Sequence, residues 1–81
     1  MYMITLYGTA TCVDCLRSKQ FLDKNNIPYD YIGLEDHPEH IETVEKYNSG
    51  MRITPTIVFD DGSFLAEPTN QVLAEKLGLA E

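Results

Sequence analysis

Residues 2–15 read Tyr-Met-Ile-Thr-Leu-Tyr-Gly-Thr-Ala-Thr-Cys-Val-Asp-Cys, and the other elements of the chain can be placed from this run. Its first part, residues 2–7, is apolar and β-rich and ends at Gly8, which is typical of a buried strand. Good helix formers follow over residues 12–24. Cys12 and Cys15 therefore lie where a strand passes into a helix.

The middle of the chain contains residues that end the first helix and begin a strand and a second helix. The first helix has one inward stripe, made of Cys15, Ser18, Leu22 and the neighbouring Phe21. Asn25-Asn26 ends this helix ahead of Pro28, and residues 29–33 form a second short strand. A second helix is expected from a capped start at Asp36-His37-Pro38-Glu39 to about residue 47, with Gly50 just beyond its end. Its inward positions are Ile41, Val44 and either Tyr47 or Asn48.

The last third of the chain contains a hairpin and a helix. Residues 56–59 and 63–66 are β-rich and flank Asp60-Asp61-Gly62, a tight-turn sequence. The last helix is capped by Thr69, runs to about residue 77 and ends at Gly78. Its expected apolar face consists of Val72, Leu73 and Leu77. The order β-α-β-α-β-β-α predicts one α/β domain over residues 1–81, with a four-stranded mixed sheet flanked by helices.

The composition excludes several classes of partner. The 81 residues include thirteen acidic and six basic side chains, which gives a net charge of −7. Nucleic acids and anionic membranes both attract Lys and Arg, so we expect neither as a partner. No apolar run approaches the ~18–20 residues of a membrane-spanning helix, and the first residues do not resemble a signal peptide. We expect a cytoplasmic monomer.

Cys12 and Cys15 are the candidate catalytic residues. Cys12 would lie at the helix N-terminus, where unpaired N–H groups and the positive end of the helix dipole favour a thiolate. Cys15 lies one turn further along the same side and is more buried. We therefore expect Cys12 to be the attacking sulfur and Cys15 the resolving one. The charge of Asp14 opposes a nearby thiolate, whereas Arg17 and Lys19 can offset it.

Three other interpretations of the cysteine pair stay open. A structural disulfide across so short a loop stabilises weakly and is unusual in a reducing compartment. A zinc site would need His37 and His40 as further ligands, but their spacing departs from that of zinc fingers. Two inert buried cysteines are the third alternative. We expect no metal site.

A second run carries a family resemblance. Residues 50–57, Gly-Met-Arg-Ile-Thr-Pro-Thr-Ile, resemble the segment before the cis-proline of thioredoxins. The chain from residue 2 to about 77 resembles the small thioredoxin-fold redoxins: glutaredoxins, mycoredoxins and the redoxins that serve ribonucleotide reductase. This resemblance implies a thioredoxin fold of the glutaredoxin type and a cis bond between Thr54 and Pro55. It also implies that the Thr54 backbone pairs with an extended substrate segment.

Candidate substrate-binding residues flank the cysteines, the proline and the start of the last helix. The Thr11 hydroxyl contacts a substrate or, as the preferred interpretation, caps the first helix. Asn70 is placed to contact a low-molecular-weight thiol, although its position at a helix start explains it equally well. The candidate set is Thr11, Val13, Thr54, Pro55, Thr69 and Asn70.

Differences from the dithiol glutaredoxins bear on the substrate. Those proteins carry a Lys three residues before the first cysteine, Pro-Tyr between the cysteines, and Gly-Gly-X-Asp at the last helix. The corresponding residues here are Thr9, Val13-Asp14 and Glu67-Pro68-Thr69-Asn70. The cationic groove that grips glutathione is therefore largely missing. Residues 58–63 and 67–69 resemble mycoredoxins, which act on mixed disulfides of the less anionic sugar thiol mycothiol.

The resulting hypothesis is a mycoredoxin-like thiol-disulfide oxidoreductase that reduces protein disulfides or mixed disulfides. It binds no cofactor, and its electron source is mycothiol or glutathione, or thioredoxin reductase with NADPH. In having a Val directly after Cys12, the chain resembles the ribonucleotide-reductase redoxins, although their aromatic C-terminal motif is absent. The alternatives are a thioredoxin-reductase-dependent electron donor to ribonucleotide reductase, a non-catalytic iron–sulfur module that uses Cys12 of two chains, and a redox-sensing module.

Overall fold

The structure is a computed structural model that describes residues 3–79. The elements in chain order are β1 (Thr5–Gly8), α1 (Val13–Lys24), β2 (Asp30–Gly33), the 3₁₀ turn η1 (Pro38–His40), α2 (Ile41–Tyr47), β3 (Thr56–Val58), β4 (Phe64–Ala66) and α3 (Asn70–Leu77). The predicted order β-α-β-α-β-β-α is confirmed. The first strand starts at Thr5 rather than residue 2, which lies outside the described residues.

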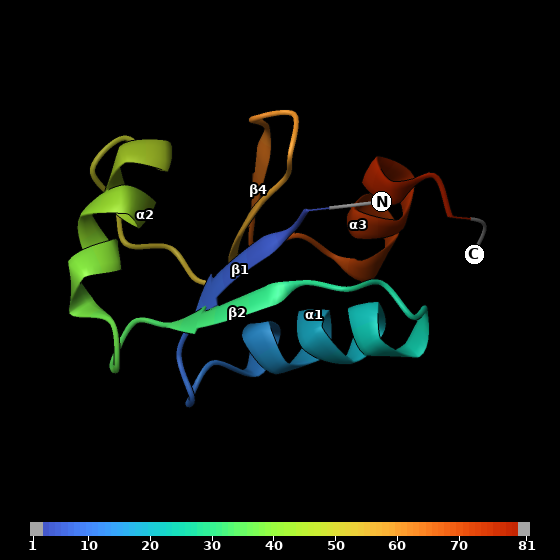
Figure 1. The fold of residues 1–81 in the computed structure, drawn as a ribbon, viewed down its shortest axis with the longest axis horizontal. Coiled ribbons are helices and arrows are strands. Elements are labelled where there is room, and N and C mark those ends of the chain that lie inside the picture. Colours follow the sequence, from blue (N-terminus) through green and yellow to red (C-terminus); the bar gives the residue numbers. More distant parts are fainter. Residues whose placement is uncertain (1–2, 80–81) are drawn as a thin grey trace.

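The four strands form one mixed sheet in the order β2-β1-β3-β4 (Figure 1). β1 pairs in parallel with β2, as a strand-helix-strand crossover requires. β3 runs antiparallel to both β1 and β4. The tight turn that joins β3 to β4 includes Gly62, whose φ of 87° lies in the left-handed region that favours glycine. The predicted four-stranded mixed sheet of the thioredoxin fold is therefore confirmed.

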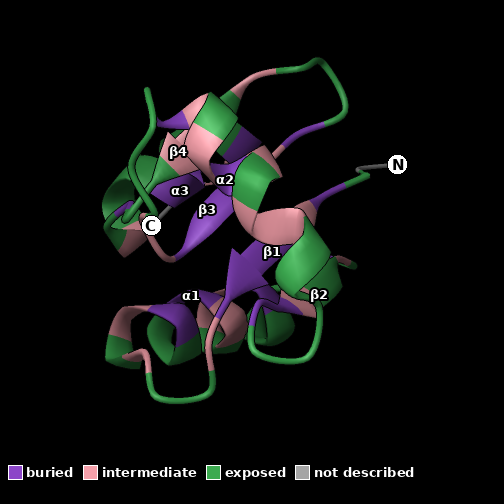
Figure 2. Cartoon of the chain, turned by 90° about the vertical axis from the view of Figure 1, so that its left-hand side faces the viewer, coloured by how far each residue is buried: buried purple, intermediate pink, exposed green. Residues whose placement is uncertain are grey.

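The two faces of the sheet pack against different helices. Leu6 and Ile57 join residues of α1 and α3 in the larger core cluster, whose buried members are Ile4, Leu6, Leu22, Ile27, Ile57, Phe59, Leu73 and Leu77. The next residue of β1, Tyr7, faces the other way and packs with Leu34 and with Val44 of α2. Successive strand side chains point to opposite faces, so this alternation puts α1 and α3 on one side and α2 on the other. Figure 2 shows the buried residues gathered along β1 and β3, between these helices.

The helix ends agree in part with the predicted capping residues. Thr69 caps α3 by accepting a hydrogen bond from the Val72 N–H (3.1 Å), and Gly78 ends it with a φ of 72°. The capped start expected within Asp36-His37-Pro38-Glu39 is wrong, because η1 precedes α2 and its capping position is His37, which makes no side-chain cap bond. Among the two inward candidates at the end of α2, Asn48 is the buried one.

The apolar face predicted for α3 is partly wrong. Leu73 and Leu77 are buried, but Val72 is 41% exposed and Ala74 is buried in its place. The inward stripe of α3 is set by its packing against α1 and the sheet.

Candidate active site

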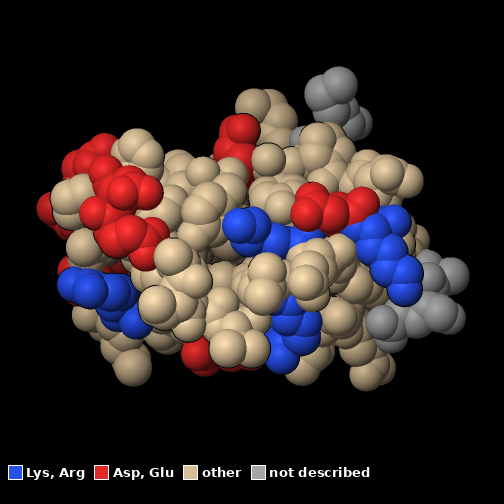
Figure 3. Space-filling view, turned by 90° about the horizontal axis from the view of Figure 1, so that it is seen from below, with Lys and Arg blue, Asp and Glu red and all other residues tan. Residues whose placement is uncertain are grey.

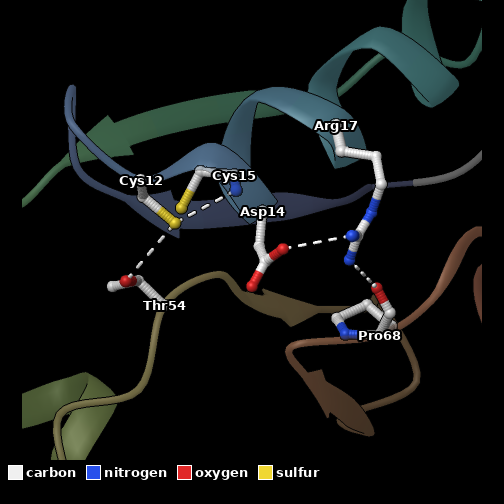
Figure 4. A network of polar contacts seen from close by, with 6 residues as sticks. All are labelled: Cys12, Asp14, Cys15, Arg17, Thr54 and Pro68. Carbon is white, nitrogen blue, oxygen red and sulfur yellow. Dashed lines mark hydrogen bonds and ion pairs between the residues drawn. The ribbon is translucent and has the colours of Figure 1, made fainter.

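Cys12 and Cys15 lie at the junction of the β1–α1 loop and α1. Cys12 is the N-cap residue of α1, and its Sγ accepts a hydrogen bond from the Cys15 N–H at 3.0 Å. The cap is therefore Cys12 itself, which corrects the expectation that Thr11 has this role. The Thr54 hydroxyl donates to the same sulfur at 3.7 Å from the opposite side of the site (Figure 4). Two donors and the positive end of α1 thus surround a half-buried sulfur, which is an environment that stabilises negative charge.

Cys15 lies behind Cys12 and is only 1% exposed. Burial raises the pKa of the Cys15 thiol to about 12, with further increases from its hydrogen bond to Cys12 and from the charge on Cys12. Both cysteines are free thiols in the structure. Cys12 is the sulfur that a substrate can reach, whereas Cys15 holds its proton in this state.

The segment that faces the cysteines is built around a cis bond between Thr54 and Pro55, as the resemblance predicted. Pro55 is buried beside Thr56, whose hydroxyl donates to the Ile53 carbonyl oxygen at 2.6 Å. Asn48, at the end of α2, donates to Thr56 Oγ1 (3.0 Å). Asn48 and Thr56 therefore hold the two ends of the loop that presents Thr54 to Cys12. The sequence left either Tyr47 or Asn48 as the inward residue and gave no reason to expect this contact.

A surface pocket of about 150 Å³ lies against Cys12 on the β2 side. The Lys19 ammonium lies 4.1 Å from the centre of the Tyr31 ring, and Glu35 accepts a hydrogen bond from the Ala10 N–H (2.8 Å). The pocket is lined by Thr9, Ala10, Thr11, Cys12, Val13, Cys15, Leu16, Lys19 and Tyr31. Tyr31 and Leu16 were not among the predicted site residues. Tyr31 lines the pocket because the β1–β2 register pairs it with Leu6. No short sequence motif predicts that register.

The charges beside Cys12 pair with each other. Arg17 lies 3.1 Å from the Asp14 carboxylate and also donates to the Pro68 carbonyl oxygen at 3.3 Å (Figure 4). Arg17 therefore offsets Asp14, as expected, and links α1 to the segment that precedes α3. Lys19 lies over Tyr31 instead of near Asp14.

The predicted substrate-binding residues fall into three places. Thr11 and Val13 line the Cys12 pocket, and Val13 is 78% exposed. Thr54 contacts the Cys12 sulfur, with Pro55 buried next to it. Thr69 and Asn70 do not line this pocket: the Thr69 hydroxyl caps α3, and Asn70 lines a separate cavity beside Arg17.

Residues 3–79 contain no group of three or more His, Cys, Asp or Glu side chains placed to hold a metal ion. At η1, His37 and His40 lie 3.5 and 4.0 Å from the Glu39 carboxylate. Within the same residues, none of the helices is both long enough and apolar enough to pass through a bilayer.

Gly8, the last residue of β1, lies directly against the side chain of Cys15. A Cβ at this position would lie 2.8 Å from Cys15 Sγ and 3.2 Å from Cys15 Cβ, which is too close for an ordinary contact. We expect Gly8→Ala to lower the free energy of unfolding by about 1–3 kcal/mol through overpacking. In a Cys15→Ala background the cost should fall by at least ~0.5 kcal/mol, because the crowded sulfur is gone. Urea unfolding of the four proteins in this cycle tests the contact, and equal costs in both backgrounds would contradict it.

The comparisons with known proteins agree with this geometry. The glutaredoxin family model matches residues 4–64, which include both cysteines and the Thr54–Pro55 bond. A Mycobacterium tuberculosis protein named as a glutaredoxin is 39% identical over 74 residues, covering 91% of this chain and 88% of the relative. Mycoredoxin 1 of Corynebacterium glutamicum is 33% identical over 81 residues, covering 100% of this chain and 96% of the relative.

The chain is also similar to a further relative and to a solved structure. The glutaredoxin-like protein NrdH of Lactococcus lactis is 34% identical over 62 residues, covering 76% of this chain and 83% of the relative. The crystal structure of a glutaredoxin from Archaeoglobus fulgidus superposes with a TM-score of 0.79 at 26% identity, covering 95% of this chain and 87% of that one. The family model agrees with the geometry of the site, in which a cysteine pair begins a helix and a cis-proline faces it. The chain therefore belongs to the glutaredoxin family.

Proposed function

We propose that residues 1–81 act as one glutaredoxin-like domain, a thiol-disulfide oxidoreductase of the mycoredoxin type that works in the cytoplasm. Its substrates are mixed disulfides between proteins and a small thiol, and protein disulfides. The observation that carries the proposal is the Cys12 sulfur, which receives hydrogen bonds from the Cys15 N–H and the Thr54 hydroxyl while it lines an open pocket. The similarity to mycoredoxin 1 over the full length of this chain supports the choice of subclass.

In the first step the Cys12 thiolate attacks the sulfur of the small thiol in a mixed disulfide. A new disulfide forms between Cys12 and the small thiol, the old S–S bond breaks, and the protein leaves as a thiolate that takes a proton from water. Helix α1 stabilises the Cys12 thiolate before attack through the Cys15 N–H. The backbone at Thr54 orients the extended substrate segment beside the sulfur.

Two routes complete the cycle. In the monothiol route a second small thiol, as its thiolate, attacks the bound small-thiol sulfur; this forms the oxidised small-thiol disulfide and restores the Cys12 thiolate. In the dithiol route the Cys15 thiolate attacks Cys12 Sγ, which releases the small thiol and leaves a Cys12–Cys15 disulfide. Two electrons from a small thiol or a reductase then restore the dithiol.

The environment of Cys15 suits it to act second. Two of the causes that raise its pKa, the hydrogen bond to Cys12 and the charge on Cys12, disappear once Cys12 is bound in a mixed disulfide. These two contributions to the raised pKa of Cys15 are therefore absent in the intermediate, whereas burial, the largest one, remains. This dependence favours attack by Cys12 first and resolution by Cys15 afterwards.

A Cys15→Ser variant separates the two routes. We expect it to retain reduction of small-thiol mixed disulfides within about tenfold of wild type, because Cys12 alone completes the monothiol route, and to lose reduction of protein disulfides, which requires a resolving thiol. Steady-state rates with a peptide–mycothiol disulfide and with an intramolecular peptide disulfide test this. Complete loss of the first activity in a folded variant would make the dithiol route obligatory.

The second candidate is an electron donor to ribonucleotide reductase that is itself reduced by thioredoxin reductase. Val13 and Leu16, which flank Cys12 and are 78% and 54% exposed, favour it because an apolar rim suits a protein partner. The similarity to NrdH points the same way. Reduction of the Cys12–Cys15 disulfide by thioredoxin reductase and NADPH, compared with mycothiol and glutathione and their reductases, distinguishes the candidates. Fast reduction by thioredoxin reductase alone would overturn the mycoredoxin proposal.

A further inference from the structure

Asn48 lies at the end of α2, on the face of the sheet opposite α1, yet its side chain is bonded to the start of β3. It is buried, with 9% of its surface exposed. Its Nδ2 donates to the Val44 carbonyl oxygen at 2.8 Å, which caps α2, and to Thr56 Oγ1 at 3.0 Å. Both N–H donors of the amide are therefore used, and one of them ties α2 to the sheet.

The Thr56 hydroxyl extends this link to the active-site loop. Thr56 is 0% exposed, and its hydroxyl donates to the Ile53 carbonyl oxygen at 2.6 Å. A hydroxyl has a single proton, so an N–H from Asn48 makes Thr56 Oγ1 an acceptor on one side and directs its proton to Ile53 on the other. The resulting bond closes a turn around the cis bond between Thr54 and Pro55.

Thr54 lies inside this turn, and its hydroxyl donates to the Cys12 sulfur at 3.7 Å (Figure 4). At this length the bond has little tolerance for a shift of the loop, since hydrogen bonds weaken steeply as their geometry is distorted. Residues 49–52, which lead into the turn, are exposed. The buried bonds of Asn48 and Thr56 therefore restrain the turn on a side where the chain is otherwise exposed.

We propose that Asn48 is a positioning residue that, through Thr56, holds the Thr54 hydroxyl against the reactive sulfur. A hydroxyl that donates to a sulfur stabilises the thiolate relative to the thiol, so the thiolate population depends on where the turn is held. The residue that holds it is on α2, across the sheet from the helix that begins at the cysteines. The catalytic consequence of this inference rests on the proposed function, in which that thiolate is the nucleophile.

The substitutions that test the inference change no charge. Asn48, Thr54 and Thr56 are neutral, so neutral replacements leave the charge distribution of Figure 3 as it is. In that view from the α1 side, Lys and Arg are spread across the face, while the largest group of Asp and Glu lies toward the α2 end. A change in the pH dependence of the reactive thiol therefore measures a hydrogen bond. The charged and titratable groups near that thiol, which the substitutions leave in place, are Cys15, Asp14 with Arg17, and Lys19 with Tyr31.

The test is the pH dependence of Cys12 alkylation by iodoacetamide, which reacts with the thiolate. Mass spectrometry locates the label, since Cys15 is only 1% exposed. We expect Thr54→Val to raise the pH of half-maximal alkylation by about 0.5–1 unit, because a hydrogen bond to a charged sulfur is lost. Asn48→Ala should raise it by about 0.3 unit or more, and the double variant should rise no further than Thr54→Val alone.

Two comparisons separate positioning from loss of structure, with circular dichroism to confirm that each variant is folded. Thr56→Val removes the hydroxyl and should act like Asn48→Ala, whereas Thr56→Ser keeps the hydroxyl and should match wild type. Asn25 is the matched control for the helix cap, because its Nδ2 donates to the Phe21 carbonyl oxygen at 2.8 Å at the end of α1. Asn25→Ala loses an equivalent cap bond and should leave the alkylation profile unchanged.

The opposite results would overturn the inference. Folded Asn48→Ala and Thr56→Val proteins with the wild-type profile would do so. A shift in Asn25→Ala as large as that in Asn48→Ala, or additive shifts in the double variant, would also do so, because Asn48 would then not act through Thr54. Alkylation needs no disulfide substrate, so a wild-type protein that reduces no disulfide would contradict the proposed function alone, and the two failures are distinguishable.

Discussion

Replacing Cys12 with serine is expected to lower the turnover of every disulfide substrate by on the order of 10³-fold or more. A serine hydroxyl is not ionised near neutral pH and forms no disulfide, so neither the monothiol nor the dithiol route can begin. Cys15 cannot substitute, since it is only 1% exposed and since burial, the largest cause of its raised pKa, is unchanged by the substitution. The measurement is kcat/KM with a mixed-disulfide peptide and with a protein disulfide.

The same substitution should not harm the fold. Cys12 caps α1 by accepting a hydrogen bond from the Cys15 N–H, and serine is a preferred capping residue that accepts the same bond. The thermal midpoint of Cys12→Ser should therefore match or exceed that of wild type, which separates lost chemistry from lost structure. Mass spectrometry supplies a control: Cys15→Ser should accumulate an adduct with the small thiol, whereas Cys12→Ser should not. A folded Cys12→Ser protein that keeps more than about a tenth of the activity would contradict Cys12 as the nucleophile.

The second large effect is on stability, at Leu73 of α3. This side chain is 0% exposed and belongs to the core cluster that joins α1, α3 and the sheet. Leu73→Ala should lower the free energy of unfolding by about 2–5 kcal/mol, through lost burial and the cavity left behind. A domain of this size has a total of only ~4–12 kcal/mol, so the variant should lose a large fraction of its stability.

The adjacent residue provides the matched control for this prediction. Val72 is on the same helix but is 41% exposed, and Val72→Ala should change the free energy of unfolding by less than about 0.5 kcal/mol. Each kcal/mol corresponds to roughly 4–8 °C in the thermal midpoint of a domain of this length, so calorimetry separates the two variants clearly. Similar losses in both would mean that the inward stripe of α3 is not the one observed.

Local interactions account for the parts of this protein that its sequence determined by itself. The element order, the Thr69 cap, the Gly78 helix end and the tight turn at Asp60-Asp61-Gly62 depend on neighbours within a few residues. The hydrogen bond from the Cys15 N–H to the Cys12 sulfur is local in the same sense. It forms within the first turn of α1, so it does not depend on where that helix packs. The cis bond before Pro55 was predicted only through the family resemblance.

Contacts between distant segments decided the rest. Val72, which was expected to be buried, is exposed and Ala74 is buried, because the rotation of α3 is fixed by its packing against α1 and the sheet. Tyr31 joins the Cys12 pocket through strand register, and Asn48 meets Thr56 only after α2 has folded over the sheet. Arg17 and Asn70, which are far apart in the chain, line one cavity because α1 packs against α3. Sequence periodicity gives each element its apolar side, but the exact rotation and neighbours of each element depend on the close packing of the whole core.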